Sequence, residues 1–183
     1  MLVPLKSPRR GKQRLRRAGV PDVTALVTSL ARDVILACHP RAVYVACSDI
    51  DAETVARDAG GLPVRTRGVD LSADVSEAYR HVSARATRIT VIPADLAFPA
   101  GLGQWDAPEG AVIVPDRHGT GTNLLSLPSG LEFVFRFGTH SAQRHVEEAR
   151  RLGLPVTVLS PSPWSWDVDE PDDIPESMQR AGS

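Results

Sequence analysis

Residues 89–97, ITVIPADLA, are the stretch of sequence that decides the fold. Ile89 to Pro93 form a short apolar run, typical of a strand buried on both faces, and Asp95 stands just past its carboxyl end. Similar apolar, β-branched runs recur along the chain and alternate with stretches of helical spacing. This alternation predicts an α/β fold, with a mostly parallel sheet and helices on both of its faces.

The expected elements follow from these runs. We expect strands at 1–4, 42–47, 63–66, 89–93, 111–115 and 156–159, and helices at 21–38, 51–59, 71–86 and 140–152. The runs 124–127 and 131–137 flank a Pro-Ser-Gly turn and suggest a β-hairpin, which could offer a surface for a homodimer. From Pro171 onward we expect at most a short helix and then a frayed end.

Composition excludes several classes of protein. The 183 residues are 42% hydrophobic and 23% charged with a net charge of −1, which suits a single globular domain over 1–183. That balance argues against disorder and against binding to nucleic acid. No apolar run approaches the roughly 18–20 residues that span a bilayer, and the first residues do not resemble a signal peptide. We therefore expect a cytoplasmic protein with no membrane partner. Cys38 and Cys47 are too few for a disulfide framework or a four-ligand zinc site.

Charge is distributed unevenly along the chain. Residues 6–17 hold seven basic side chains and no acidic one, whereas residues 167–176 hold six acidic side chains and no basic one. A phosphate-binding end and a metal-binding end would show this pattern, and so would two solvated surfaces; charge runs alone favour the solvated surfaces.

Four polar segments fall where predicted strands end. They are 6–14, 94–95, 116–123 and 167–169. Ligands of open α/β sheets bind beyond the carboxyl ends of the strands, so this coincidence indicates an enzyme. Lys6, Lys12 and Arg14 lie on a Pro/Gly-containing loop and could neutralise a triphosphate, although a solvated basic turn would look the same.

The acidic residues suggest a metal site. Asp167 and Asp169 alternate, so in an extended segment both side chains point the same way and repel each other unless a cation bridges them. Carboxylate ligands select Mg²⁺ or Mn²⁺ over zinc. Asp95 could be a third ligand or a helix N-cap. Asp172 and Asp173 follow a proline, are expected to begin the last helix and are excluded as ligands.

Two further segments suit an anion. DRHGTGTNLL contains the run Gly119–Asn123, whose backbone N–H groups and hydroxyls could contact an anion or simply form a turn. FGTHS places Gly138 before a helix and Ser141 in its first turn, where a helix N-terminus favours negative charge. His140 and His145 are five residues apart, the wrong spacing for paired ligands, so His145 is expected to be structural or adjacent to the substrate.

These motifs together resemble one known family. VPLKSPRRGKQRL, IPADL, VIVPDRHGTGTNLL, FRFGTHSAQRHVEEA and DVDEPDDI occur in this order between residues 3 and 174. They resemble segments of the guanylyltransferases of coenzyme F-420 (deazaflavin) biosynthesis, which use 2-phospho-L-lactate or phosphoenolpyruvate. The resemblance implies a Rossmann-like nucleotidyltransferase fold of the nucleotide-diphospho-sugar transferase type. It also implies transfer of GMP from GTP to a phosphorylated three-carbon acid, with release of pyrophosphate.

The resemblance also implies residue roles. It implies that Mg²⁺ is held by Asp95, Asp167 and Asp169. It also implies that Lys6, Lys12 and Arg14 bind the triphosphate, and that these three residues and Asp95 are catalytic. The acid substrate would be held by Thr122, Asn123, Gly138 and Ser141. Two departures fall near the expected base and ribose site: Leu71-Ser72 stands where the family has Leu-Asn, and Ala97-Phe98 where it has Pro-Leu. Ser72 is the residue expected to contact the nucleotide there.

Two alternatives remain open from the residues. One is a related nucleotidyltransferase with another base or acceptor, and the other is a nucleotide-binding paralogue without turnover. The small acid-binding elements argue against a bulky acceptor, and the retained carboxylates argue against lost turnover, because grouped carboxylates are costly without a cation. Resemblance to the bacterial members favours phosphoenolpyruvate over 2-phospho-L-lactate, although no single residue decides between them.

Overall fold

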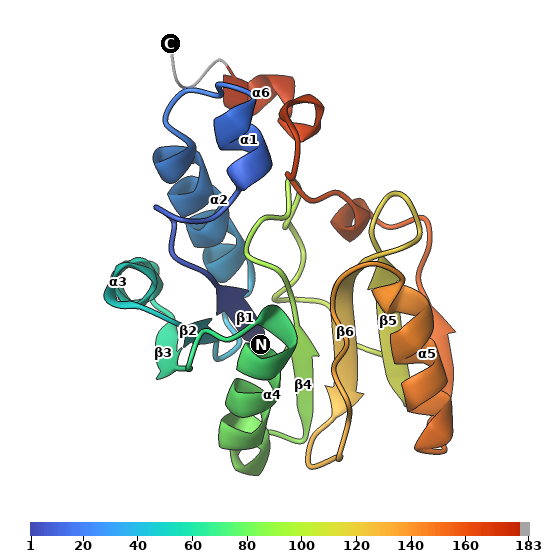
Figure 1. Cartoon of the computed structure of the whole chain (residues 1–183). Helices are drawn as coiled ribbons and strands as arrows, with labels where there is room; N and C mark the ends of the chain where they lie inside the picture. The colour runs from blue at the N-terminus through green and yellow to red at the C-terminus, as the bar shows by residue number, and fades with distance from the viewer. Residues whose placement is uncertain (180–183) are drawn as a thin grey trace.

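The computed structural model describes residues 1–179, which form a seven-stranded sheet in the order β3-β2-β1-β4-β6-β5-β7 (Figure 1). The strands are β1 Leu2–Leu5, β2 Tyr44–Cys47, β3 Leu62–Arg65, β4 Arg88–Val91, β5 Ala111–Pro115, β6 Thr122–Pro128 and β7 Val156–Val158. Each neighbouring pair is parallel except that β6 runs antiparallel to both β4 and β5. The expectation of a mostly parallel sheet is confirmed.

Helices cover both faces of the sheet. They are α1 Gln13–Arg17, α2 Val23–Ala37, α3 Ile50–Asp58, α4 Leu71–Val82, α5 Ser141–Arg151 and α6 Glu176–Gln179, with 3-10 turns η1 Ser83–Arg85, η2 Pro163–Ser165 and η3 Pro171–Asp173. Buried side chains of α2 and α3 pack with one face, and those of α4 and α5 with the other. No helix in this part of the chain is long and apolar enough to cross a membrane. The frayed end expected after the last helix lies outside the described residues.

The expected β-hairpin is wrong in its second strand. Residues 131–137 form no strand, and the antiparallel partner of β6 in the hairpin is β5, joined to it through residues 116–121. The run LEFVFRF alternates like a strand and buries Phe133 and Phe135. Its backbone N–H groups at Val134 and Arg136, however, donate to the side chains of α5 rather than to a neighbouring strand. The suggested dimer surface therefore does not exist as a hairpin, and homodimer formation stays a prediction.

A third cluster of buried side chains joins the two ends of the chain. The short helix α1, which the sequence did not predict, turns Leu15 into this cluster, and the C-terminal segment contributes Val168. Figure 1 shows α1 and α6 side by side at the same end of the molecule. The cluster fixes the basic loop against the acidic segment. Its buried members are Leu15, Val23, Val27, Leu30, Ala97 and Val168.

Candidate active site

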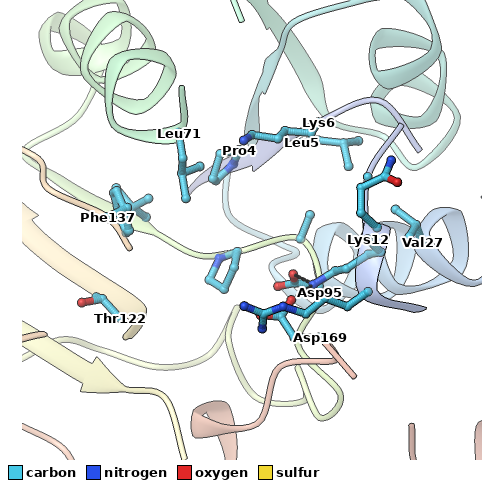
Figure 2. Close-up of a pocket in the computed structure, with 16 residues that line it drawn as sticks. Pro4, Leu5, Lys6, Lys12, Val27, Leu71, Asp95, Thr122, Phe137 and Asp169 are labelled. Carbon is cyan, nitrogen blue, oxygen red and sulfur yellow. Dashed lines mark hydrogen bonds and ion pairs between the residues drawn. The ribbon is translucent and has the colours of Figure 1, made fainter. Parts of the chain in front are cut away.

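The candidate site lies where β1 and β4 end and β6 begins. Because β6 is antiparallel to β4, its first residues meet the carboxyl ends of the parallel strands at one edge of the sheet. A cavity of about 430 Å³ opens there (Figure 2). A second cavity, of about 550 Å³, shares Arg14, Asp95, Thr122 and Asp169 with it. Between them, the two cavities are lined by every predicted site residue except Ser72.

Lys12 bridges two of the predicted metal ligands. Its ammonium forms ion pairs with Asp95 Oδ2 and, at 2.5 Å, with Asp169 Oδ1, as Figure 2 shows. Burial alone would lower the pKa of Lys12, but the charges of Asp95 and Asp169 outweigh burial and hold that pKa above its ordinary value. Lys12 is therefore charged and supplies the cation that grouped carboxylates require.

A short stretch of pairing brings the acidic segments together across the sequence. Leu96 and Asp167 form an antiparallel bridge, Val168 N–H donates to Asp95 O at 3.0 Å, and Ala97 N–H donates to Trp166 O at 2.8 Å. Asn123 Nδ2 donates to Asp167 Oδ1 at 3.1 Å. Burial, with the nearby charge of Asp95, raises the pKa of Asp167 to about 6. The structure thus places all three predicted carboxylates at one site.

The three carboxylates do not enclose a common point. Within residues 1–179, no set of three or more His, Cys, Asp or Glu side chains is arranged to hold a metal ion. The metal-ligand roles of Asp95, Asp167 and Asp169 therefore stay predictions. The chemistry of the donors, carboxylate oxygens that repel one another, is that of a hard cation site.

Asp173 and Arg117 fasten the acidic segment, a role that the sequence did not reveal. Asp173 is buried in η3, and its Oδ2 accepts the N–H groups of Asp169 at 2.9 Å and Glu170 at 2.7 Å. Arg117 forms an ion pair with Asp173 and lies over the ring of Trp166, 4.8 Å from its centroid. The spacing Glu170-Pro-Asp-Asp173 is that of a capping box, and it is the signal that could have located Asp173.

The predicted acid-binding residues form a polar group on the opposite side of the cavity. Thr122 Oγ1 lies 3.1 Å from His145 Nδ1 and accepts a hydrogen bond of 3.0 Å from Ser141 Oγ. Ser141 is the first residue of α5, and Gly138, with a φ of 112°, turns the chain toward it. Glycine suits this φ because other residues rarely adopt it.

The glycine-rich loop is closed by its own aspartate. Asp116 accepts the N–H groups of His118 at 3.1 Å, Thr120 at 2.8 Å and Gly121 at 2.7 Å. Burial would raise the pKa of Asp116, but these hydrogen bonds hold it below its ordinary value. The loop's N–H groups at these three residues therefore bind Asp116 instead of an external anion.

Ser72 is placed differently from the other predicted residues. Its hydroxyl accepts the N–H of Phe137 at 2.9 Å and so ties α4 to the 131–137 segment, whereas Leu71 next to it lines the cavity. Nucleotide binding by Ser72 stays a prediction. Arg14 lines both cavities and lies 3.5 Å from Glu170.

Comparison with known proteins agrees with this geometry. A family described as "Guanylyl transferase CofC like" matches residues 1–182. The chain belongs to this family. It is 32% identical to a phosphoenolpyruvate guanylyltransferase of Roseiflexus castenholzii, over 99% of this chain and 88% of the relative. It is 28% identical to a 2-phospho-L-lactate guanylyltransferase of Methanothermobacter thermautotrophicus, over 96% of this chain and 82% of the relative.

A solved structure shares the fold. A nucleotidyl transferase from Methanothermobacter thermautotrophicus superposes with a TM-score of 0.62 at 14% identity, covering 94% of each chain. At this identity the likeness concerns the fold alone. The expectation of a nucleotidyltransferase-like α/β fold is confirmed.

Proposed function

We propose that this protein is a guanylyltransferase that transfers GMP from GTP to phosphoenolpyruvate or 2-phospho-L-lactate, releasing pyrophosphate, in coenzyme F-420 biosynthesis. Membership of the CofC-like family supports the reaction, and similarity to several proteins named phosphoenolpyruvate guanylyltransferase favours phosphoenolpyruvate. One observation in the structure carries the proposal. A single edge of the sheet joins a basic loop and three carboxylates to a group of hydroxyls at a helix N-terminus.

The two sides of the site suit the two substrates. Lys6, Lys12 and Arg14 would neutralise the triphosphate, because cationic side chains bind phosphate oxygens strongly. Across the cavity, the carboxylate and phosphate of the acid would be held by Thr122, Asn123, Gly138 and Ser141. The attacking group would be a phosphate oxygen of the acid, which is already ionised near neutral pH because its second pKa is about 6. Such a reaction depends on positioning and charge neutralisation, so no general base is needed.

The carboxylates suit magnesium as the cofactor. Asp95, Asp167 and Asp169 supply oxygen ligands only, and Lys12 now provides the positive charge between two of them. Bound magnesium would supply charge neutralisation for the triphosphate and the departing pyrophosphate. Those carboxylates would then no longer require the Lys12 ammonium, which could bind the triphosphate. We also propose a cytoplasmic location, supported by the free, buried cysteines Cys38 and Cys47.

Pyrophosphate release tests the function directly. The protein is incubated with Mg²⁺, each of the four nucleoside triphosphates, and phosphoenolpyruvate, 2-phospho-L-lactate or a sugar phosphate. We expect release with GTP and a three-carbon phospho-acid only. Release with another nucleoside triphosphate or another acceptor would show that the proposed base or acid is wrong. No release with any combination would overturn the proposal.

A matched pair of variants tests the site. Asp169→Asn removes a proposed ligand of Mg²⁺, the cation that would neutralise the transition state, and should reduce turnover by a factor of at least about 100. Asp172→Asn removes an exposed charge three residues away and should leave turnover near that of the wild type. Equal activity in the two variants would contradict the assignment of Asp169.

A further inference from the structure

We propose that His145 is a positioning residue: it fixes the direction of the hydrogen bonds at Thr122, so that the Thr122 hydroxyl can only donate to the acid substrate. The inference rests on the proposed function, because it assumes that the acid binds beside Thr122. His145 is buried and lines neither cavity, and it is not among the proposed acid-binding residues. Its role would determine which ligand groups the site accepts.

The first step concerns the tautomer of His145. The backbone N–H of Arg136 donates to His145 Nε2 at 3.0 Å, so Nε2 must carry a lone pair and no proton. Burial lowers the pKa of His145 to about 4, so the ring is neutral near pH 7. A neutral imidazole holds one proton, which must then be on Nδ1. The 131–137 segment thus selects the tautomer.

The second step follows the proton on Nδ1. This nitrogen lies 3.1 Å from Thr122 Oγ1, so the Nδ1–H group donates to that oxygen. Ser141 Oγ donates to the same oxygen at 3.0 Å. A hydroxyl oxygen accepts two hydrogen bonds and donates one. Both acceptor positions of Thr122 are therefore occupied, and only its own O–H remains.

The third step is the direction of that O–H group. Thr122 lines both cavities, and Figure 2 shows it beside the space between Phe137 and Asp169. No hydrogen bond described within residues 1–179 takes the proton of Thr122. The hydroxyl can therefore donate to an acceptor in the cavity, and it cannot accept from a donor there.

This arrangement sets a rule for the ligand. Carboxylate and phosphate oxygens are pure acceptors when ionised and match a hydroxyl that can only donate. An amide N–H or a hydroxyl hydrogen at the same place would face an oxygen with no free lone pair. The His145–Thr122–Ser141 chain would therefore select a phospho-acid over its neutral amide, and would do so without a charged side chain of its own.

Two substitutions of His145 separate this role from a structural one. The side chain of His145→Asn reaches the position of Nδ1 and can keep the donor to Thr122, but it loses the acceptor for Arg136 N–H. His145→Gln reaches the position of Nε2 and can keep that acceptor, but it loses the donor. With wild-type and variant folds compared by circular dichroism and thermal unfolding, the KM values for GTP and for phosphoenolpyruvate are measured separately.

We expect His145→Gln to raise the KM for phosphoenolpyruvate about tenfold, the scale of one lost hydrogen bond, with the KM for GTP unchanged. His145→Asn should stay within about threefold of the wild type for both substrates. A larger rise for Asn than for Gln, or equal rises in the KM values of both substrates, would overturn the proposal in favour of a structural role.

A second measurement does not depend on activity. Nitrogen-15 NMR of the ligand-free wild type, with the His145 signal assigned by its loss in His145→Gln, reports which ring nitrogen holds the proton. We expect protonated Nδ1 at pH 7, and protonated Nε2 would overturn the proposal. If the wild type releases no pyrophosphate with any acid, the proposed function fails. The role of His145 is then still tested by the NMR measurement and by calorimetric titration of phosphoenolpyruvate into both variants.

Discussion

At the scale of single residues, Lys12 joins two carboxylates of the site. Its side chain is only 12% exposed, and its ammonium lies between two carboxylates whose mutual repulsion it offsets. Asp167 stands beside the same pair, and its pKa is raised first by burial and then by the charge of Asp95. A divalent cation bound at these carboxylates would offset the same repulsion as Lys12, so each should partly replace the other.

Lys12→Met tests this exchange. Removing the ammonium should lower the free energy of unfolding by about 2 kcal/mol without metal, less than for a fully buried pair because Asp169 is half exposed. Added Mg²⁺ should raise the Tm of this variant more than that of the wild type, since it would relieve the uncompensated carboxylates. Calorimetry with and without Mg²⁺ measures both effects.

Lys6→Met serves as the control for this change. It removes a charge from the same loop, and none of the described ion pairs joins Lys6 to a carboxylate. Its Tm should respond to Mg²⁺ as the wild type does. Equal Mg²⁺ responses in Lys12→Met and the wild type would contradict magnesium binding at these carboxylates.

At the scale of elements, the turn η3 positions the segment that carries Asp167 and Asp169. Asp173 accepts two backbone N–H groups of this segment and pairs with Arg117 from the β5–β6 loop. The loop and the C-terminal segment are thus fastened to each other through one carboxylate. A change in η3 should therefore alter the positions of the carboxylates at the proposed metal site, although Asp173 is not one of the proposed ligands.

Asp173→Asn tests the fastening. The amide keeps one acceptor oxygen, but the buried side chain at this position loses its ion pair with Arg117, so the free energy of unfolding should fall by about 2–3 kcal/mol. The concentration of Mg²⁺ needed for half-maximal activity should rise several-fold, because Asp169 is less firmly held. Denaturant titration and Mg²⁺ titration measure the two effects, and Asp172→Asn is the control. Matching values for the two variants would show that Asp173 does not position the segment.

Sequence patterns predicted the elements where local spacing decided the structure. The helix and strand ends lie within a few residues of the expected positions, except where contacts between distant segments determine the local conformation. Residues 131–137 alternate like a strand, yet the segment's N–H groups bind side chains of α4 and α5, which no local pattern reveals. Helix α1 was missed because KQRLRR offers one apolar residue, Leu15, whose burial depends on the C-terminal segment.

The same distinction holds for the site. Asp95, Asp167 and Asp169 could be predicted to meet because each follows a motif at a strand end or in an extended acidic segment. The contacts of His145 with Arg136 and of Asp173 with Arg117 could not be predicted, because these partners come from the folded 131–137 segment and the β5–β6 loop.

At the scale of the whole molecule, stability should depend on pH through α5. Burial lowers the pKa of His145 from 6.5 to about 4, so the unfolded chain binds more protons than the folded one between these values. The pKa of Glu148 is lowered from 4.5 to about 2, mainly by the hydrogen bonds from Arg151, although burial opposes this shift. Between these two pH values the unfolded chain again binds more protons than the folded one. Stability is therefore lost as the pH falls, first through His145 and then through Glu148.

The expected loss from His145 is about 3 kcal/mol between pH 6.5 and pH 4, taking about 1.4 kcal/mol for each unit of pKa difference. Urea unfolding across this range measures it in the wild type and in His145→Asn. The variant should show a flatter dependence on pH in this window. Parallel curves for the two proteins would show that His145 does not remain neutral in the folded state.

Because β6 runs in the reverse direction, the residues proposed for the two substrates lie on two different halves of the sheet. The residues proposed to bind the triphosphate, together with Asp95, follow β1 and β4. The residues proposed to bind the acid, Thr122, Asn123, Gly138 and Ser141, belong to the β5–β6–α5 unit on the other side. Under the proposed roles, acceptor preference would depend on one contiguous stretch of the chain, separate from the residues that would bind the nucleotide. Grafting residues 116–141 between relatives would then carry acid preference with it and leave the donor nucleotide as before.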